Sequence, residues 1–470
     1  MTPEEYAFAT IPALGRWLRN GSVSPVELAE LALARLEQVG MPLNAVVRLT
    51  ADLAMEQARQ AEDELARGVD RGPLHGIPYG AKDLLATAGI PTTWGAPPFA
   101  DQIFPHDAAV VERLREAGAV LVAKLATVEM AGGFGYEQPN AALTGPGRNA
   151  WNREAWAGGS SSGSGAAVAA GCVPFAIGSE TWGSIMSPAG YNGISGLRPT
   201  YGRVSRRGAM ALAWTLDKLG PMARTAAECA TVLAAIAGPD PAEPTTAASA
   251  PFEVPAVQAE GFRFAVLKDG AAQAQPEVRA NFEASLAVLR EMGSVEEVTL
   301  PDLPFDAAVS VVINAEAASA FEEFTIEGRS AGLVAPEDRI GLVHAFAIPA
   351  VDYLRALRIR RLGSRQIDTL LTPFDAIVAP THPSVAPPID QPFKPFFDRH
   401  QGPRLGAAGN LCGLPSITAP NGFGERGLPT GIEFMGRAWG EDRVVAAAMA
   451  FQARTAWHLR TPDEALGVRR

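Results

Sequence analysis

The pattern of apolar and polar residues near the start of the chain predicts a helix with a well-defined first turn. The segment Ser24-Pro25-Val26-Glu27 places a capping serine before a proline that suits the first helical position, and a glutamate follows three residues after the serine. Leucine and alanine then recur at helical spacing as far as Leu36. We expect a helix to begin directly after Ser24.

The next apolar stretch combines a second helix with a buried strand. Asp107 precedes apolar residues at helical spacing between Val110 and Ala117, which makes it a candidate helix cap. The run Ala119–Ala123 is short, rich in valine and leucine, and bounded by Gly118 and Lys124, as is typical of a buried strand. A helix followed by a buried strand indicates α/β layering.

The second half of the chain continues this alternation after a connecting segment. Residues 237–257 are rich in proline, alanine and threonine and lack both periodicities, so we interpret them as a surface connection. Beyond them, Phe262–Leu267 and Asp375–Ala379 have the pattern of strands, and Val278–Met292 has that of a helix. No internal repeat is evident, and we treat residues 1–470 as one domain.

Charge and hydropathy exclude several classes of protein. The 470 residues include 40 lysines and arginines against 51 aspartates and glutamates, and this net charge of −11 argues against a nucleic-acid binder. The first ten residues lack the basic and apolar regions of a signal peptide, and no apolar stretch is long enough to span a bilayer. We therefore expect a cytoplasmic protein that does not contact a membrane.

Cysteine and histidine usage points away from metal sites and disulfides. The three cysteines, Cys172, Cys229 and Cys412, are odd in number and widely spaced. The six histidines are scattered, without a pair at metal-ligand spacing. We expect neither a metal nor a cofactor. A Ser-His-Asp triad stays possible, because its members need not be adjacent in sequence.

One segment combines burial with polar chemistry. Between Ala155 and Leu197 the only charged residue is Glu180, although 19% of the whole chain is charged. The same segment is dense in glycine and serine, in 158–165 and again in 178–184. Buried hydroxyls need partners and buried glycines indicate close backbone approach, so we predict a packed polar site here.

Other interpretations of the glycine-serine segment are weaker. A flexible linker would not be embedded in a region stripped of charge. Residues 159–163 fit the GxSxG pattern of a nucleophile elbow and 163–165 begin like a dinucleotide loop, but neither follows a predicted strand. Outside this segment, Lys82 lies among apolar neighbours that would lower its pKa if the segment is buried, and a surface lysine paired with Asp83 is the alternative.

These residues together resemble the amidase signature family of serine hydrolases. The resemblance covers nearly the whole chain and is weakest at about 255–370, which we expect to be a variable region on the substrate side. Its motifs are Gly76-Ile77-Pro78 leading to Lys82-Asp83, Gly158-Gly159-Ser160-Ser161, Gly183-Ser184-Ile185 and the run Gly196–Ser205. The implied fold is α/β, with a large mixed central β-sheet covered by helices on both faces.

The resemblance also implies a Ser-Ser-Lys triad. Ser184, 24 residues after Ser160, would be the nucleophile. Ser160, held by a non-proline cis peptide, would relay its proton, and Lys82 would be the neutral base. Backbone N–H groups of Thr181, Trp182, Gly183 and Ser184 would form the oxyanion hole.

Three residues depart from the family's pattern. Trp182 stands in place of a second glycine, Met186 in place of an arginine two residues after the nucleophile, and Ala126 in place of an asparagine. Without that arginine we expect a neutral, apolar or aryl amide or carbamate as substrate. Trp182 and Met186 would then line the pocket with two small residues, Ala131 and Gly133. Plain core packing is the alternative for Trp182.

The sequence thus predicts an amidase that cleaves a C–N bond in a small molecule through an acyl-enzyme. We expect a monomer or homodimer that does not bind nucleic acid. Two alternatives remain. One is the amidase subunit of a glutamine-dependent tRNA amidotransferase, which the stretch Pro199–Ser205 also resembles. The other is a non-catalytic family member in which Trp182 disables the oxyanion loop.

Overall fold

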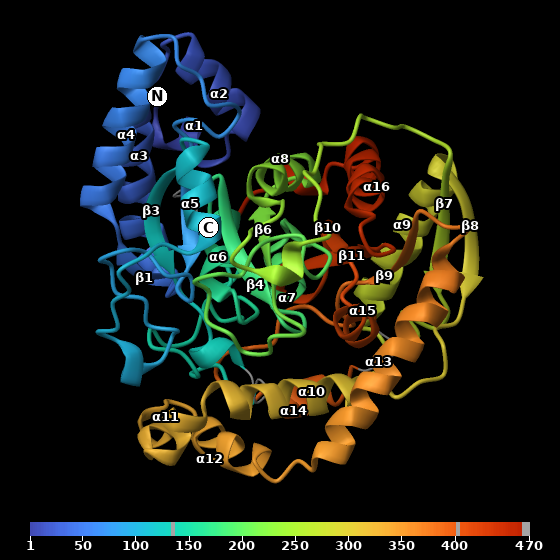
Figure 1. Ribbon diagram of the computed structural model, residues 1–470. Coiled ribbons are helices and arrows are strands. Elements are labelled where there is room, and N and C mark those ends of the chain that lie inside the picture. The colour runs from blue at the N-terminus through green and yellow to red at the C-terminus, as the bar shows by residue number, and fades with distance from the viewer. Residues whose placement is uncertain (133–136, 401–404, 463–470) are drawn as a thin grey trace.

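A single mixed β-sheet runs through the whole molecule (Figure 1). The computed structural model describes residues 1–132, 137–400 and 405–462. The sheet has 11 strands in the order β1-β3-β2-β4-β6-β5-β10-β11-β9-β7-β8, and helices pack on both of its faces, so the predicted fold class is confirmed. The strands are β1 (Val46–Leu49), β2 (Pro78–Lys82), β3 (Val120–Leu125), β4 (Phe175–Glu180), β5 (Ser195–Arg198), β6 (Lys218–Ala223), β7 (Phe262–Leu267), β8 (Gly293–Val298), β9 (Ala376–Pro380), β10 (Ser416–Phe423) and β11 (Pro429–Met435).

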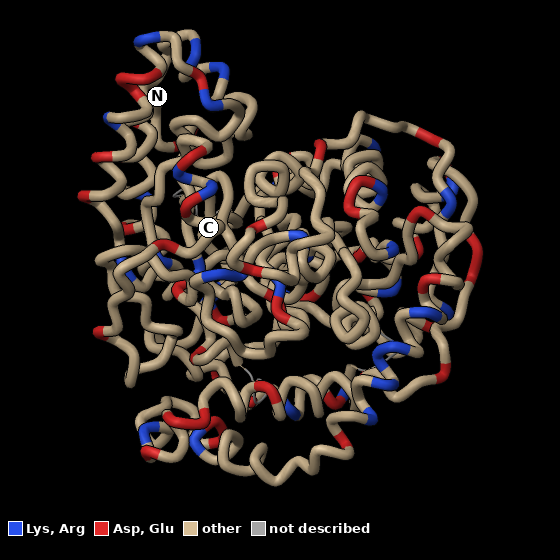
Figure 2. The backbone as a smooth tube through the Cα atoms, in the orientation of Figure 1, with Lys and Arg blue, Asp and Glu red and all other residues tan. Residues whose placement is uncertain are grey.

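The helices that cover the sheet come from both ends of the chain and from its middle. They are α1 (Pro3–Ala7), α2 (Ile11–Arg19), α3 (Pro25–Arg35), α4 (Ala51–Ala66), α5 (Ala109–Glu116), α6 (Ser162–Ala169), α7 (Met186–Asn192), α8 (Ala226–Ile236), α9 (Pro276–Met292), α10 (Phe305–Ala320), α11 (Glu322–Ile326), α12 (Pro336–Ala345), α13 (Ala350–Leu371), α14 (Lys394–Phe397), α15 (Leu405–Leu411) and α16 (Glu441–Arg454). Figure 2 shows charged residues along the helices at the left edge of the view and along α13.

Most of the elements predicted from hydrophobic patterns are present. Helix α3 begins after Ser24, whose side chain and that of Glu27 form the expected reciprocal cap. The strand predicted at Phe262–Leu267 is β7, and those predicted near 119–123 and 375–379 are β3 and β9. The predicted helix at Val278–Met292 is α9, which begins two residues earlier.

The cap predicted at Asp107 is wrong, although the helix is present. Helix α5 starts one residue later, with Ala108 at the N-cap and no side-chain hydrogen bond there. The Asp107 carboxylate instead accepts the Ala88 N–H at 2.8 Å and pairs with Arg115 in the last turn of the same helix. A charged guanidinium and a loop amide therefore take the oxygens that a cap would have used.

The charge-poor segment 155–197 forms the buried centre of the fold. It contains α6, β4, α7 and the first three residues of β5, and every residue of these four elements is buried. All eight residues of α6 are buried, so this helix has no face exposed to solvent. A Cβ on Gly163 would come within 2.3 Å of the Ala45 carbonyl oxygen and 2.4 Å of the Ala126 nitrogen, so close backbone approach requires glycine there.

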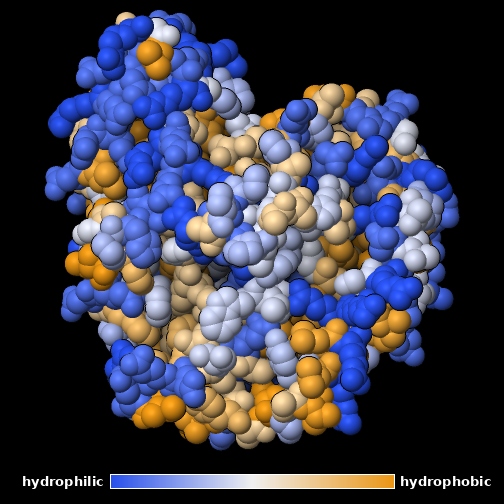
Figure 3. All heavy atoms as spheres, in the orientation of Figure 1, coloured by the Kyte–Doolittle hydropathy of each residue, from blue (hydrophilic) through white to orange (hydrophobic). Residues whose placement is uncertain are grey.

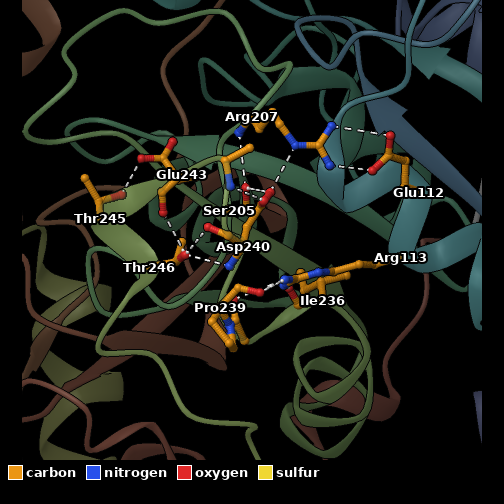
Figure 4. Close-up of polar contacts among 12 residues, drawn as sticks. Glu112, Arg113, Ser205, Arg207, Ile236, Pro239, Asp240, Glu243, Thr245 and Thr246 are labelled. Atoms are coloured by element: carbon orange, nitrogen blue, oxygen red, sulfur yellow. Dashed lines mark hydrogen bonds and ion pairs between the residues drawn. The ribbon is translucent and has the colours of Figure 1, made fainter.

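Polar contacts fix the start of the segment that follows α8 (Figure 4). Asp240 accepts the Ser205 hydroxyl at 2.7 Å and the Arg207 Nε at 3.1 Å, and Arg207 also forms an ion pair with Glu112 on α5. Arg113 of the same helix donates to the carbonyl oxygens of Ile236 and Pro239. Residues 205–240 are thereby tied to α5. That residues 237–257 divide the chain as a surface connection stays a prediction.

Helices α10 to α13 form an arm along one edge of the molecule (Figure 1). Apolar side chains gather at the lower edge of Figure 3, and the exposed ones on α12 and just after it include Ile340, Val343 and Phe346. Among the described residues no single helix is both long and apolar enough to cross a membrane. Only α12 and α13 taken together, across a bend of 95°, have the length and composition of a span.

Candidate active site

Lys82 is a fully buried lysine at the end of a central strand. It closes β2, whose five residues are all buried, and its side chain has no exposed area. The Lys82 Nζ lies 2.6 Å from the Ser160 Oγ and 2.9 Å from the Ser179 Oγ. The alternative of a surface lysine is therefore wrong, and the lysine and the first serine of the predicted triad are in contact.

The topology of the sheet explains how these residues meet. Strands β2 and β4 are parallel neighbours, with Tyr79 opposite Phe175 and Ala81 opposite Ile177. Their carboxyl ends therefore lie at the same edge, where Lys82 ends one strand and Ser179 nearly ends the other. Ser160 precedes α6, whose close packing brings it to the same place, and the Gly159–Ser160 peptide is cis, as the resemblance implied.

The surroundings of Lys82 favour its neutral form near neutral pH. Burial lowers the pKa of Lys82 to about 7, while the more distant carboxylates of Asp217 and Glu180 act in the opposite direction. Its contacts with Ser160 and Ser179 are to hydroxyl groups, which stabilise an ammonium less than a carboxylate in contact would. A base with a pKa near 7 can accept a proton under ordinary conditions.

Ser184 lies in the loop between β4 and α7, beside the Ser160 segment. It is 4% exposed, and its carbonyl oxygen accepts the Ser161 N–H at 3.3 Å. Gly183, the residue before it, has a φ of +83°, a backbone conformation that favours glycine. The second serine of the predicted triad is thus hydrogen-bonded, through its backbone, to the residue next to the first.

Buried carboxylates hold both ends of the loop 181–184. Asp217 accepts the Thr181 hydroxyl at 2.6 Å. Glu180 accepts the N–H groups of Ile185 at 2.8 Å and Met186 at 3.0 Å. Burial by itself would raise the pKa of Glu180, but its ion pair with Arg198 and these hydrogen bonds hold that pKa at about 2. The loop that carries the predicted oxyanion donors is therefore fixed at its beginning and its end.

A cavity of about 720 Å³ opens onto Ser184. Trp182 is 37% exposed and lines this cavity, so the alternative of core packing does not describe it. Met186 and Ala131 also line it, as predicted, whereas Gly133 lies outside the described residues. On another side, Tyr191 and His382 stack with ring centroids 4.2 Å apart. The cavity is therefore rich in aromatic rings.

Acidic side chains outnumber basic ones among the described residues that line the cavity. Among the described residues that line it, Arg198 is the only lysine or arginine, and its Nη1 lies 2.8 Å from Glu180. Asp306, Asp398 and Glu433 also line the cavity. In the described part of the chain, no three His, Cys, Asp or Glu side chains form a group that could hold a metal ion.

Sequence reasoning missed three groups that support the site: Ser179, Asp217 and Asn410. Ser179 is a second hydroxyl partner of Lys82, and Asn410 donates to Glu180 at 2.9 Å from a helix 230 residues further along the chain. A signal was present for the Glu180 cluster, because a lone acid in a charge-free segment needs a buried cation. No signal in the sequence identified Asp217, which only the tertiary fold brings to Thr181.

The mixed sheet and the buried lysine-serine pair define the class of α/β enzymes with an amidase-signature core. The family model described as Amidase matches residues 27–445, and the chain belongs to this family.

Curated relatives of this chain are named as components of an amidotransferase. It is 37% identical to a glutamyl-tRNA(Gln) amidotransferase subunit of Methylococcus capsulatus, over 96% of this chain and 98% of that protein. It is 38% identical to the protein of the same name from Roseiflexus sp., over 95% of this chain and 96% of the relative. The names of these relatives favour the amidotransferase alternative over the neutral-amide interpretation.

Solved structures of similar proteins include a peptide amidase. The native peptide amidase of Stenotrophomonas maltophilia has a TM-score of 0.87 and 32% identity, with 98% of this chain and 99% of that chain covered. A structure described as a vestigial protein complex that reveals the origins of an s-triazine catabolic enzyme also has a TM-score of 0.87, at 31% identity, covering 95% of this chain and 98% of that one.

Proposed function

We propose that this protein hydrolyses the C–N bond of an uncharged amide or carbamate through an acyl-enzyme on Ser184. The observation that carries the proposal is the buried Lys82 Nζ, 2.6 Å from the Ser160 Oγ and with a pKa of about 7. A lysine in this state accepts a proton, and a hydroxyl in contact with it can pass one on.

In the first half of the reaction the Ser184 Oγ attacks the carbonyl carbon. Its proton passes to the Ser160 Oγ while the Ser160 proton passes to Lys82, which becomes an ammonium. The developing oxyanion accepts hydrogen bonds from backbone N–H groups of residues 181–184. Because Glu180 and Asp217 hold the two ends of that loop, these donors need little reorganisation as the charge develops.

Collapse of the tetrahedral adduct breaks the C–N bond. The Lys82 ammonium returns its proton through Ser160 to the leaving nitrogen, so the amine departs neutral and Ser184 is left as an ester. Water then attacks the ester with the same relay as base, which releases the acid and restores the Ser184 hydroxyl. A carbamate would follow the same steps.

The cavity supports a neutral substrate with apolar or aromatic groups. The Trp182 ring, which is 37% exposed, offers a face for an aryl or alkyl group. Met186, which by the resemblance stands where the family has an arginine, also lines the cavity. A carboxylate on the substrate would meet the acidic side chain of Asp306. The guanidinium of Arg198 in the described lining is already paired with Glu180 through its Nη1, which leaves its Nη2 without a hydrogen-bond partner.

A second candidate is the amidase subunit of a glutamine-dependent amidotransferase. The names of the curated relatives, at 36–38% identity over most of the chain, support this candidate more directly than the first. The composition of the cavity supports the first candidate, a hydrolase of uncharged amides or carbamates. The carboxylate of glutamine would need a cationic partner in the cavity. In the second role the chain would act with a partner protein, whereas a free-standing amidase would act alone.

The two candidates differ in what the purified chain does alone. We would assay it on neutral anilides, aryl carbamates, carboxyl-bearing amides and glutamine, beside Ser184→Ala. Hydrolysis of anilides or carbamates by the wild type only, in a sample containing a single chain, is the expected outcome. Glutamine hydrolysis that needs a co-purified protein would establish the second candidate instead.

A fluorophosphonate probe tests whether the chain is catalytic at all. The wild type is expected to form a covalent adduct at Ser184, and Ser184→Ala is expected to form none. Absence of labelling in the wild type would favour the non-catalytic alternative, in which Trp182 prevents the loop from forming an oxyanion hole.

A further inference from the structure

A second buried lysine lies on the strand next to that of Lys82. Lys124 belongs to β3, which runs parallel to β2 and places Lys124 opposite Ala81. Its side chain has no exposed area, and neither has that of Asp83, the residue that follows Lys82. The Lys124 Nζ lies 3.1 Å from the Asp83 Oδ1. A buried ion pair is therefore present directly after the candidate base.

Both members of this ion pair have further partners. The Lys124 Nζ also donates to the Leu85 carbonyl oxygen at 2.8 Å and to the Thr92 Oγ1 at 2.7 Å. The Asp83 Oδ2 accepts the backbone N–H of Thr93 at 2.9 Å and the hydroxyl of the same residue. Three partners match the three N–H groups of an ammonium, so the buried lysine has the contacts that its charged form needs.

The alternation of side chains along a strand separates Asp83 from Lys82. Asp83 extends β2 by one ladder hydrogen bond, from its N–H to the Leu125 carbonyl oxygen at 2.8 Å. Because successive residues of a strand point to opposite faces, Lys82 and Asp83 leave the chain on different sides. Lys82 reaches two serine hydroxyls, whereas Asp83 reaches Lys124. The carboxylate that is nearest to Lys82 in sequence is thus held away from it.

The ion pair also joins the two strands whose ends meet at the candidate site. Strand β3 leads from Lys124 towards Val128, whose N–H donates to the Ser160 carbonyl oxygen at 3.0 Å. Strand β2 ends at Lys82 itself. A contact between Asp83 and Lys124 therefore fixes the strand end that carries the lysine against the strand end that contacts the backbone of Ser160. The 2.6 Å contact between the Lys82 Nζ and the Ser160 Oγ follows from this arrangement.

The two charges of the pair largely cancel each other at Lys82. Opposite charges 3.1 Å apart act on a third group mainly as a dipole, which is much weaker than a single charge. The carboxylates that do act on Lys82 are Asp217, just before β6, and Glu180, at the end of β4. Asp107 acts on Lys124 in the same direction as its ion-pair partner does. Loss of one member of the pair would leave a single charge beside the base.

We propose that the buried ion pair of Asp83 and Lys124 positions the base of the reaction, because it fixes the end of β2 and keeps a carboxylate from contacting Lys82. The inference rests on the proposed function for the role that it gives to Lys82. Asp83 and Lys124 are positioning residues, because each acts through Lys82. While the pair is intact, the base contacts hydroxyl groups and stays free to accept a proton.

Matched substitutions separate the two members of the pair. Lys124→Met removes the ammonium, keeps much of the side-chain volume and leaves a carboxylate beside the base. Asp83→Asn keeps the shape of the side chain and leaves the ammonium. The double variant Asp83→Asn/Lys124→Met removes both charges together, a change that protein interiors often tolerate. Lys268→Met removes a lysine whose side chain is 54% exposed and is the control.

The first measurement is the dependence of kcat/KM on pH with a neutral substrate. In Lys124→Met the midpoint of the acidic limb is expected to rise by roughly one pH unit, because the remaining carboxylate stabilises the ammonium form of Lys82. In Asp83→Asn the midpoint is expected to fall, because an ammonium remains. Lys268→Met should leave it unchanged. Two midpoints that do not move, or that move in the same direction, would overturn the proposal.

The double variant tests the mechanical part of the same role. Its midpoint is expected to return to that of the wild type, because no single charge remains beside the base. Its kcat is expected to fall about tenfold with KM little changed, since the ends of β2 and β3 are no longer joined. A double variant with the kcat of the wild type would contradict the positioning role. This comparison decides the matter even if one of the single variants does not fold.

A titration of Lys82 itself needs no substrate. The chain has five lysines, so NMR of lysine labelled with carbon-13 at Cε can resolve them, and Lys82→Met assigns the signal. The midpoint of the Lys82 signal is expected to rise in Lys124→Met and to fall in Asp83→Asn. If no substrate is hydrolysed, the proposed function fails and this titration still decides the inference. A Lys82 signal with the same midpoint in both variants and the wild type would refute it.

Discussion

At the scale of single residues, the proposed mechanism depends on Lys82, because its burial removes the solvent that would keep it charged. Lys82→Ala and Ser184→Ala are each expected to reduce kcat by about 10³-fold or more, since each removes a member of the relay. Ser160→Ala is expected to be milder, because a water molecule can take the place of the lost hydroxyl. The measurement is steady-state hydrolysis of a neutral anilide. Full activity in Lys82→Ala would refute the assignment of the base.

The dependence of kcat/KM on pH is expected to reflect the protonation of the same lysine, Lys82. The pKa of Lys82 is lowered from 10.5 to about 7, so its neutral form predominates above pH 7 and is lost as the pH falls. We expect kcat/KM to rise about tenfold per unit below pH 7 and to level off above it. A profile that is flat from pH 5 to 8 would show that no group with this pKa acts as base.

Met186 is the residue at which selectivity for uncharged substrates can be tested. Met186→Arg places a guanidinium at the wall of the cavity, where it can pair with a substrate carboxylate. The ratio of kcat/KM for a carboxyl-bearing amide to that for the matching neutral amide is expected to rise about tenfold or more. If the ratio does not move, this position does not set the preference.

At the scale of elements, α6 shows that a glycine in a helix can be required by packing. Gly163→Ala would normally favour a helix by about 1 kcal/mol, but here the new methyl group meets backbone atoms of Ala45 and Ala126. We expect the free energy of unfolding in urea to fall by roughly 1–3 kcal/mol. Gly15→Ala in α2 is the control. Its methyl group comes within 2.8 Å of the end of the flexible Arg19 side chain, and the nearest backbone atom, the Pro73 carbonyl oxygen, is 4.0 Å away, so a loss of equal size there would contradict the packing argument.

Elements with local signals were the ones that sequence analysis could predict. The cap at Ser24 is made by residues three apart, and the strand at Phe262–Leu267 is encoded in its own apolar run. The cap at Asp107 failed because Arg115, in the last turn of its helix, and the amide of Ala88, 19 residues away, took its oxygens. A local sequence pattern shows which structure a segment favours. Which of several donors a carboxylate finally accepts depends on the tertiary fold.

The candidate site was predicted from motifs, not from spacing alone. Lys82 and Ser160 are 78 residues apart, and only the family resemblance placed them together. No motif in the sequence indicated that Asp217 and Asn410 support the loop. Side chains that only position other residues can come from any segment that the fold places nearby. A single sequence therefore identifies the reacting groups more readily than the residues that position them.

At the scale of the whole molecule, the burial of Lys82 lowers stability, and the proposed function gives a reason for keeping it. Because its pKa is lower in the folded state, the unfolded chain binds the proton more tightly between about pH 7 and 10.5, and stability rises with pH in this window. Lys82→Met is expected to be inactive and more stable than the wild type. Its advantage should be largest below pH 7 and shrink by about 1.4 kcal/mol per unit above it. Urea unfolding at pH 6 and 9 measures the difference, and a larger advantage at pH 9 would contradict this sign.

The central pairing of the sheet joins residues that are made at very different times. Strand β5 pairs with β10, and Gly196 lies opposite Thr418. This pairing can therefore form only after residue 418 has been synthesised. While the ribosome is still synthesising the last part of the chain, β5 has an open edge toward which other nascent strands can add. Until residues 416–423 have been synthesised, the edge of β5 that β10 covers in the finished fold has no partner of its own.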